Sequence, residues 1–261
     1  MKTKALVVLS GGQDSTTCLF WAKEHFDEVS AITFDYGQRH RIEIAAAQKV
    51  VGLAGITYHE VVHVPNCLIS SSPLTSNAPL ETYHNAEQMD EIIGNCRELT
   101  FVPMRNALFL TIAANRAEAL GIPNIVTGVC QMDNANYSDC REIFIRAAEQ
   151  YINTALGHDD RGTQPITIVT PLLHMSKAES VKLAFETPGC WNALAYSHTS
   201  YDGLYPPTGM NHSNVLRADG FEKAGLPDPL VLRAVSQGVM AMPKQSNYTT
   251  HALGRGLEYV R

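Results

Sequence analysis

The stretch Leu9-Ser10-Gly11-Gly12-Gln13-Asp14-Ser15-Thr16-Thr17 decides the fold of this chain. It follows an apolar run at residues 5–9 and precedes an amphipathic run at residues 18–22, a pattern that predicts a strand, a tight loop and a helix. The two glycines let the backbone bend sharply and approach a ligand closely. Because the loop amides and the positive end of the helix dipole point to one place, we predict that this loop binds phosphate.

Seven residues of the loop are candidates for binding a nucleotide: Ser10, Gly11, Gly12, Gln13, Asp14, Ser15 and Thr16. The loop has neither the Gly-Lys-Ser/Thr ending of a Walker A motif nor the Gly-x-Gly-x-x-Gly pattern. Asp14 is an unusual residue for an anion site, and we interpret it as a carboxylate that holds Mg²⁺ directly or through water. The alternative is an ordinary glycine-containing turn in which Asp14 or Ser15 caps the helix.

The bulk composition fits one large α/β domain, with or without a small appendage. The chain has 261 residues, 45% of them apolar, and a net charge of −6, which gives no overall basic field for nucleic acid. It has neither a signal-peptide pattern nor an apolar run of membrane-spanning length, so we expect a cytoplasmic protein. Its six cysteines are far apart, which favours buried thiols or chemistry over disulfides.

Strand and helix patterns alternate along the chain. Further strands are predicted at residues 29–37, 56–62, 125–129 and 166–172, with helices between them. This alternation predicts a doubly wound, parallel, five-stranded α/β sheet, which binds ligands at the carboxyl ends of its strands. Asp35, Tyr36, Gly37 and Gly128 follow or end such strands, so we expect them beside the nucleotide. Residues 66–100 are rich in Asn, Ser and Pro and weakly periodic, and we expect a flap near the site.

Two basic residues stand at predicted helix starts, where the helix dipole disfavours a cation. Arg105, followed by Asn106, opens a helix that runs to residue 120, and Lys177 follows Ser176 in a capping-box pattern with Glu179. We expect a phosphate or ribose, or an acidic partner, to offset Arg105, and a polyphosphate to offset Lys177. The alternative for Lys177 is a solvated surface lysine.

Residues 133–141 concentrate polar side chains at another predicted strand end: Asp133, Tyr137, Asp139, Cys140 and Arg141. A heterocycle with a carboxylate could use all of them, with Arg141 as a bidentate clamp, an aspartate on amino groups and Tyr137 stacking. Asp139 could instead cap the helix that begins at Cys140. We interpret Cys140 as packing or support, with a nucleophile as the alternative.

These motifs, taken in order, resemble a known family. Residues 10–15 look like the pyrophosphate loop of the ATP pyrophosphatases, and with Phe34-Asp35-Tyr36-Gly37-Gln38-Arg39-His40, Phe101-Val102-Pro103-Met104-Arg105-Asn106, Tyr137-Ser138-Asp139-Cys140-Arg141 and Lys177 they resemble the 7-cyano-7-deazaguanine synthases. The resemblance covers most of residues 4–190. It implies the adenine nucleotide alpha hydrolase-like fold, a homodimer, and an enzyme of queuosine biosynthesis that uses ATP, Mg²⁺ and ammonia.

The same resemblance implies a mechanism and roles. ATP adenylates the carboxylate of 7-carboxy-7-deazaguanine, ammonia displaces AMP to give an amide, and a second activation permits dehydration to the nitrile. The residues that orient ATP and balance charge are Asp14, Ser15, Arg105 and Lys177, and those that recognise the substrate are Asp133, Tyr137, Asp139 and Arg141. Residues 1–187 would form the nucleotide-binding domain, and residues 188–261 a C-terminal region.

Members of the family carry four cysteines that bind zinc: one cysteine, followed later by three in the motif Cys-Gly-x-Cys-x-x-Cys. This chain departs from that pattern. Cys190 matches the first, while Thr208, Asn211 and Asn214 stand where the other three are expected. We therefore expect the structural zinc site to be absent, with packing or hydrogen bonds among the amides in its place. A substitute site of Cys190, His198 and His212 is the alternative.

Residues 230–261 extend beyond the usual ending of the family, and they could wrap a dimer partner, cover the site or fray. Two other functions stay open. One is a ligase that joins adenylated 7-carboxy-7-deazaguanine to an amine on a protein or nucleic acid. The other is a non-catalytic nucleotide-binding protein, against which the presence of Ser10, Asp14, Ser15, Arg105 and Lys177 argues.

Overall fold

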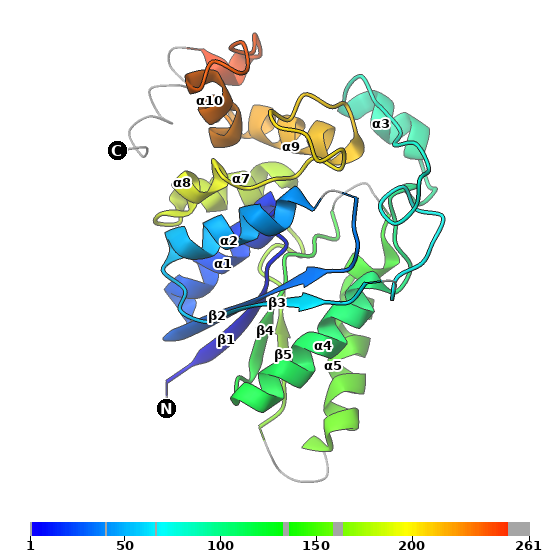
Figure 1. Ribbon diagram of the computed structural model, residues 1–261, viewed down its shortest axis with the longest axis vertical. Coiled ribbons are helices and arrows are strands. Elements are labelled where there is room, and N and C mark those ends of the chain that lie inside the picture. Colours follow the sequence, from blue (N-terminus) through cyan, green and yellow to red (C-terminus); the bar gives the residue numbers. More distant parts are fainter. Residues whose placement is uncertain (1, 40, 66, 133–135, 159–163, 250–261) are drawn as a thin grey trace.

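A computed structural model describes residues 2–39, 41–65, 67–132, 136–158 and 164–249 (Figure 1). Five strands form one parallel sheet in the order β3-β2-β1-β4-β5. Their bounds are β1 Lys4–Val8, β2 Glu28–Asp35, β3 His59–His63, β4 Asn124–Val126 and β5 Thr167–Val169. The predicted doubly wound sheet is confirmed, with β1 and its loop at the point where the strand order reverses.

Helices cover both faces of the sheet (Figure 1). On one face lie α1 (Gln13–His25) and α2 (Ile42–Ala54), with α7 (Lys177–Glu186) and α8 (Cys190–Leu194) packed against α1. On the other face lie α4 (Arg105–Leu120) and α5 (Glu142–Leu156). A short 3₁₀ turn, η1 (Ser138–Cys140), precedes α5.

The central strand supplies both hydrophobic cores. Ala5 and Val7 pack into the core on the α1 side, whereas Leu6 packs into the core on the α4 side. All three side chains are fully buried, because successive residues of a strand point to opposite faces and both faces are covered by helices. This explains why the run before the loop is apolar throughout.

β4 and β5 each end three residues earlier than their patterns predict, and β2 ends two residues earlier, at Asp35. β4 stops at Val126 rather than residue 129, and β5 stops at Val169 rather than residue 172. Pro171 follows β5 and has no N–H to donate to a neighbouring strand. Beyond the strands the two segments stay in contact, because Gln131 N donates to Leu173 O at 2.9 Å.

The segment 66–100 contains a helix that its weak periodicity concealed, α3 (Ala86–Ile93). Met89 and Ile93 of α3 pack with Tyr83 and with Val215, and Tyr83 N donates to Met210 O at 2.7 Å. The described part of this segment is therefore attached to the C-terminal region. Its role as a flap stays a prediction.

The C-terminal region consists of α9 (His212–Ala224), α10 (Pro229–Ser236) and a 3₁₀ turn, η2 (Ser246–Tyr248). α9 packs against α7, and Phe221 of α9 joins the same core as Trp191 of α8 (Figure 1). The domain boundary after residue 187 also stays a prediction. None of the helices that the structure describes combines the length and apolar composition needed to cross a membrane.

Candidate active site

The loop between β1 and α1 is shaped by its own serine hydroxyls. Ser15 Oγ accepts a hydrogen bond from Ser10 N and donates one to Gly12 O, both at 3.2 Å, and Ser10 Oγ accepts one from Gly12 N at 3.2 Å. No side chain caps α1, so the alternative in which Asp14 or Ser15 is its cap is wrong. The amides of the first helical turn are therefore not capped by a side chain, which is the arrangement that a phosphate site uses.

Two glycines allow other elements to press against this loop. Gly11 has a φ of +90°, and a Cβ there would lie 2.3 Å from the carbonyl oxygen of Glu43 and 2.7 Å from the amide of Ala47, both on α2. A Cβ on Gly128 would lie 3.1 Å from the backbone of Asp14. Gly11 O also accepts a hydrogen bond from His198 N at 2.8 Å. The loop is thus enclosed by α2, by the end of β4 and by a segment far along the chain.

Lys177 lies beside the loop rather than on the surface. Its Nζ is 2.8 Å from Asp14 Oδ2, and only 10% of its side chain is exposed, so the alternative of a solvated lysine is wrong. The aliphatic stem of Lys177 packs where a Cβ on Gly220 would lie, at 2.3 Å from Lys177 Cγ. Because the pair joins the first turns of α7 and α1, Asp14 offsets a cation that the dipole of α7 disfavours.

Arg105, at the start of α4, is half-buried among aromatic and acidic groups. Its guanidinium interacts electrostatically with Tyr36, Tyr201, Tyr137 and Asp139. Burial raises the pKa of Tyr36 to about 12, although Arg105 acts in the opposite direction. Burial likewise raises the pKa of the Asp139 carboxyl, and Arg105 offsets part of that rise. An acidic partner for Arg105 is therefore present in the protein itself.

Asp139 joins η1 to the start of α4. Its Oδ2 accepts a hydrogen bond from Asn106 N at 3.3 Å, and Asn106 Nδ2 donates to Asp139 O at 3.1 Å and to Cys140 Sγ at 3.4 Å. The N-cap of α5 is Arg141, without a side-chain cap. The alternative in which Asp139 caps the helix after it is therefore wrong, since η1 separates the two.

Tyr137 is held by a buried carboxylate. Tyr137 Oη donates to Glu98 Oε2 at 3.0 Å and lies 2.5 Å from Thr100 Oγ1. Glu98 is 4% exposed and also accepts from Thr100 N at 2.6 Å. The ring of Tyr137 lies against Phe101, with ring centroids 5.4 Å apart.

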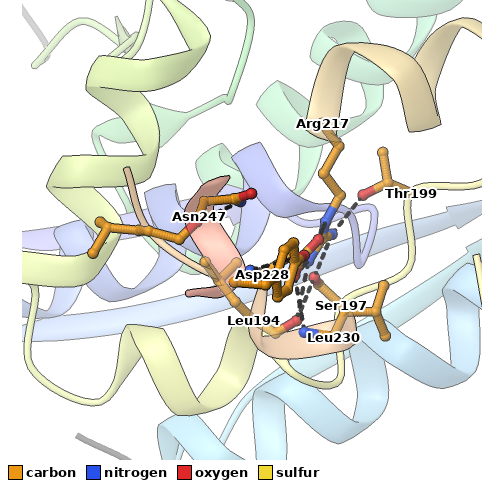
Figure 2. A network of polar contacts seen from close by, with 9 residues as sticks. Leu194, Ser197, Thr199, Arg217, Asp228, Leu230 and Asn247 are labelled. Carbon is orange, nitrogen blue, oxygen red and sulfur yellow. Dashed lines mark hydrogen bonds and ion pairs between the residues drawn. The ribbon is translucent and has the colours of Figure 1, made fainter. Parts of the chain in front are cut away.

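A buried ion pair joins Arg217 of α9 to Asp228, and Arg217 also contacts the segment at residues 197–199 (Figure 2). Arg217 donates to both carboxylate oxygens of Asp228, at 2.6 and 2.8 Å, and to Ser197 Oγ and Thr199 Oγ1 at 2.9 and 2.8 Å. The two side chains are only 3% and 5% exposed. The buried guanidinium therefore has hydrogen-bond acceptors for its N–H groups. It also orients the segment in which His198 N donates to Gly11 O of the loop between β1 and α1.

The described part of the C-terminal tail packs onto the same pair. Tyr248 Oη accepts from Asp228 N at 3.3 Å, and Asn247 Nδ2 donates to Leu226 O at 2.9 Å. Asn247 and Tyr248 therefore attach this part of the tail to its own chain. Residues 250–261 lie outside the described residues, so the three expectations for the end of the tail stay open.

Two of the three residues expected in place of the zinc cysteines, Asn211 and Asn214, meet around Ser200 and not around Cys190. Ser200 Oγ accepts from Asn211 Nδ2 at 3.1 Å and Asn214 Nδ2 at 2.8 Å, and donates to Asp202 Oδ1 at 2.5 Å. Cys190 instead lies in the hydrophobic core, where burial raises the pKa of its thiol to about 12. Ser200 therefore lies beside Asn211 and Asn214 whereas Cys190 does not, so the match of Cys190 to the first zinc cysteine does not fit the geometry.

This cluster does not fit zinc. A hydroxyl and neutral amides are poor ligands for Zn²⁺, and here they are bonded to one another. Across residues 2–249, outside the undescribed gaps, no three His, Cys, Asp or Glu side chains are grouped so as to hold a metal ion, which also argues against the set of Cys190, His198 and His212.

A cleft at the carboxyl ends of β1, β2 and β4 collects most of the predicted site residues. Those that line it are Ser10, Gly12, Gln13, Asp14, Ser15, Tyr36, Arg105, Gly128, Tyr137, Arg141 and Lys177. Gly11, Thr16, Asp35, Gly37 and Asp139 do not line it, and Asp133 lies outside the described residues. Asp35 is occupied elsewhere, because its Oδ2 accepts from Arg41 at 2.5 Å and lies 3.2 Å from His63 Nδ1.

Several lining residues were not predicted as site residues. They include Glu43, Phe109, Asn136, Thr199, Tyr201, Ser213 and Arg217. Glu43 follows Arg39 by four residues and lies in the first turn of the helix after a predicted site strand. This position in the sequence could have indicated that it lines the site. Ser213 and Arg217 reach the cleft through the packing of α9 on α7, which no local pattern indicates.

Comparison with known proteins gives one consistent result. The family model described as queuosine biosynthesis protein QueC matches residues 4–225. The chain is 48% identical over 233 residues to a 7-cyano-7-deazaguanine synthase of Laribacter hongkongensis, covering 88% of this chain and 94% of the relative. It is 46% identical over 229 residues to one of Gloeobacter violaceus, covering 87% and 95%. A solved U34-tRNA thiolase, NcsA from Methanococcus maripaludis, matches at 16% identity and a TM-score of 0.41 over 99% of this chain and 81% of that one, which is too weak a likeness to interpret.

Proposed function

The chain belongs to the QueC family of queuosine biosynthesis proteins, and we propose that it is a cytoplasmic 7-cyano-7-deazaguanine synthase that converts 7-carboxy-7-deazaguanine and ammonia into the nitrile with ATP. The observation that carries the proposal is the composition of the cleft. A phosphate-type loop at residues 10–15 shares it with Lys177 and Arg105 and with the polar residues Tyr137 and Arg141. One cleft can thus hold a nucleotide and a carboxylate together.

The nucleotide half of the cleft is built for phosphate. Ser10, the first-turn residues of α1 and Lys177 line the cleft together, so backbone amides and a cation are available to a phosphate there. Charge develops on the α-phosphate when the carboxylate attacks it. Fixed amides and cations that already point there stabilise this charge without reorganising.

The substrate half is built for a flat acid. Tyr137 offers a ring, Arg141 a guanidinium, and Arg105 a half-buried positive charge. A guanidinium binds a carboxylate through two parallel hydrogen bonds, which fixes its orientation. The chief task of these residues is to place the carboxylate in line with the α-phosphate, because most of the rate gain in such a transfer comes from positioning.

Mg²⁺ is part of the proposal, and the residues present fit it. Asp14 is a hard oxygen donor that lines the cleft beside the phosphate loop. Mg²⁺ in nucleotide sites is commonly bound by one or two carboxylates together with phosphate oxygens, and it supplies charge neutralisation there. Lys177, 2.8 Å from Asp14, would then share the carboxylate and a phosphate oxygen. Assembly as a homodimer is a further part, which light scattering at several concentrations tests.

The proposal is tested by mass spectrometry on purified protein incubated with ATP, Mg²⁺, ammonium and 7-carboxy-7-deazaguanine. The expected products are the nitrile, AMP and pyrophosphate. A reaction that stops at the adenylate or amide, or that adds mass to a protein, would favour the alternative ligase. Binding of ATP without release of AMP would favour a non-catalytic protein.

A further inference from the structure

Glu98 and Thr100 are buried, while Leu99 between them is exposed. The exposed fractions are 4% for Glu98, 2% for Thr100 and 55% for Leu99. The hydrophobic effect favours the reverse order, because burying a carboxylate costs free energy and burying a leucine gains it. The burial of Glu98 therefore has to be compensated by its hydrogen bonds.

The hydrogen bonds of Glu98 lead to the candidate substrate site. Its Oε2 accepts from Thr100 N at 2.6 Å and from Tyr137 Oη at 3.0 Å, and Thr100 Oγ1 donates to the same oxygen. Tyr137 lines the cleft that the described residues form, whereas Glu98 and Thr100 do not. Glu98 thus holds a cleft residue from behind, without a place in the cleft itself.

The same short segment holds the rest of the loop around Tyr137. Asn136, which also lines the cleft, donates through Nδ2 to the carbonyl oxygens of Gly94 and Cys96, at 3.1 and 2.9 Å. The ring of Phe101 supports that of Tyr137, with centroids 5.4 Å apart. Residues 94–101 therefore fix the backbone before Tyr137, its ring and its hydroxyl at once.

We infer that Glu98 is a positioning residue for 7-carboxy-7-deazaguanine, which acts by fixing Tyr137 in the substrate half of the cleft. This inference rests on the proposed function and adds a residue that does not touch the substrate. A ring that is already held by its hydroxyl loses little freedom when a flat base binds against it, so binding costs less entropy. The phosphate loop has its own hydrogen bonds, so Glu98 should affect the acid and not ATP.

Glu98→Gln tests this role, because the amide keeps the size of the side chain and loses the negative charge that the hydroxyls meet. Isothermal titration calorimetry measures the Kd of 7-carboxy-7-deazaguanine and that of ATP separately. The Kd of the acid should rise about tenfold, as for one lost hydrogen bond to a charged group. The Kd of ATP should stay the same.

Glu81→Gln is the matched control. Glu81 belongs to the same segment and accepts the hydroxyl of Tyr83 at 2.8 Å, but Tyr83 does not line the cleft. The same substitution there should leave the Kd of the acid unchanged. Thr100→Val, which removes one hydroxyl beside Glu98, is a milder second variant, and it should raise the Kd of the acid about fivefold, as for a hydrogen bond between neutral groups.

A double-mutant cycle separates positioning from a general loss of stability. Tyr137→Phe removes the hydroxyl through which Glu98 acts. Once that hydroxyl is gone, Glu98→Gln should have little left to disturb, so the double variant should bind the acid within about twofold of Tyr137→Phe alone. An effect of Glu98 that does not pass through Tyr137 would add in full.

Full additivity would overturn the inference, as would equal weakening of ATP and acid, or an equal rise in Kd for Glu81→Gln. An unchanged Kd of the acid in Glu98→Gln, shown to be folded by thermal unfolding, would also overturn it, and so would an unchanged Kd in Thr100→Val where Glu98→Gln does not fold. Binding is measured without turnover, so a protein that binds the acid and makes no nitrile overturns only the proposed function. An unmodified protein that binds no 7-carboxy-7-deazaguanine would overturn both.

Discussion

The hydroxyl of Tyr137 lies 3.0 Å from the buried carboxylate of Glu98, from a segment that precedes α4. The same carboxylate accepts the backbone N–H of Thr100, so the orientation of the Tyr137 ring in the cleft depends on residues 98–100. This gives part of the segment 66–100 a defined structural relation to the candidate substrate site.

Tyr137→Phe should weaken substrate binding without affecting ATP. Removing the hydroxyl leaves Glu98 with one donor fewer, so the ring loses its anchor. A lost hydrogen bond to a charged group corresponds to about a tenfold rise in the KM for 7-carboxy-7-deazaguanine. Steady-state kinetics with each substrate varied measure this, and Tyr151→Phe, whose hydroxyl bonds Thr111 on α4, is the control. A matching rise in the KM for ATP would contradict the assignment.

Asp14→Ala should abolish ATP turnover and leave the fold intact. The variant removes the carboxylate that we assign to Mg²⁺ and leaves Lys177 without that partner at the phosphate loop. AMP release and far-UV circular dichroism on the same sample measure the two outcomes. Asp219→Ala, from a partly exposed helical pair with Lys223, should retain full turnover. Full activity of Asp14→Ala would remove the metal-carboxylate role.

Asp228→Ala should strongly destabilise the protein. It leaves the guanidinium of Arg217 buried beside Ser197 and Thr199 without its counter-ion. Breaking a buried pair in this way costs about 3–5 kcal/mol, whereas a partly exposed pair contributes about 1 kcal/mol or less. Denaturant unfolding compares the variant with Glu60→Ala, which breaks the partly exposed pair with Arg116. Equal losses for the two variants would refute the distinction.

Gly11→Ala should be far more damaging than Gly55→Ala. Both glycines have a positive φ, but a Cβ on Gly11 would clash with the backbone of α2, while a Cβ on Gly55 would have no neighbour within 4 Å. Gly55→Ala should therefore cost about 1 kcal/mol from backbone strain alone. Gly11→Ala must also displace α2, and we expect loss of ATP turnover together with a larger drop in melting temperature.

Ser200→Ala should destabilise the protein, whereas chelators should leave its melting temperature unchanged. The hydroxyl of Ser200 is a shared partner of Asn211 and Asn214, and its removal leaves buried amide donors short of acceptors, at a cost of about 1–3 kcal/mol. A zinc-dependent fold would behave in the opposite way, because its metal supplies folding energy. Thermal unfolding with and without EDTA decides, and a clear drop in melting temperature with EDTA would contradict the hydrogen-bonded cluster.

The fold was predictable because its signals are local. The apolar run before Ser10, the glycines and the alternation of strands with helices all follow from residues that are close in sequence, and the five-stranded sheet resulted. The strand ends were less predictable, since Val129 and Leu172 are apolar because they pack in the cores and not because they pair with a neighbouring strand. The helix α3 was missed because only Met89 and Ile93 of its eight residues are buried.

The site was predictable only where its residues belong to a contiguous motif. The loop at 10–15, Arg105 and Lys177 could be assigned from helix starts, but the pairing of Asp14 with Lys177 needs the packing of α7 on α1. The same limit explains the error over Cys190. A cysteine in sequence order was matched to a ligand position, whereas Ser200, an inconspicuous residue, is the one that meets Asn211 and Asn214 in space.

The hydrogen bond from His198 N to Gly11 O has a consequence for folding during synthesis on the ribosome. The phosphate loop is among the first parts of the chain to leave the ribosome, yet the segment that contacts it is oriented by Arg217, which in turn depends on Asp228. The nascent sheet can assemble early, in the usual N-terminal-first order. Its nucleotide site is completed only when nearly all of the chain has been made, so an abandoned, truncated product would fold in part without a finished loop to hold ATP.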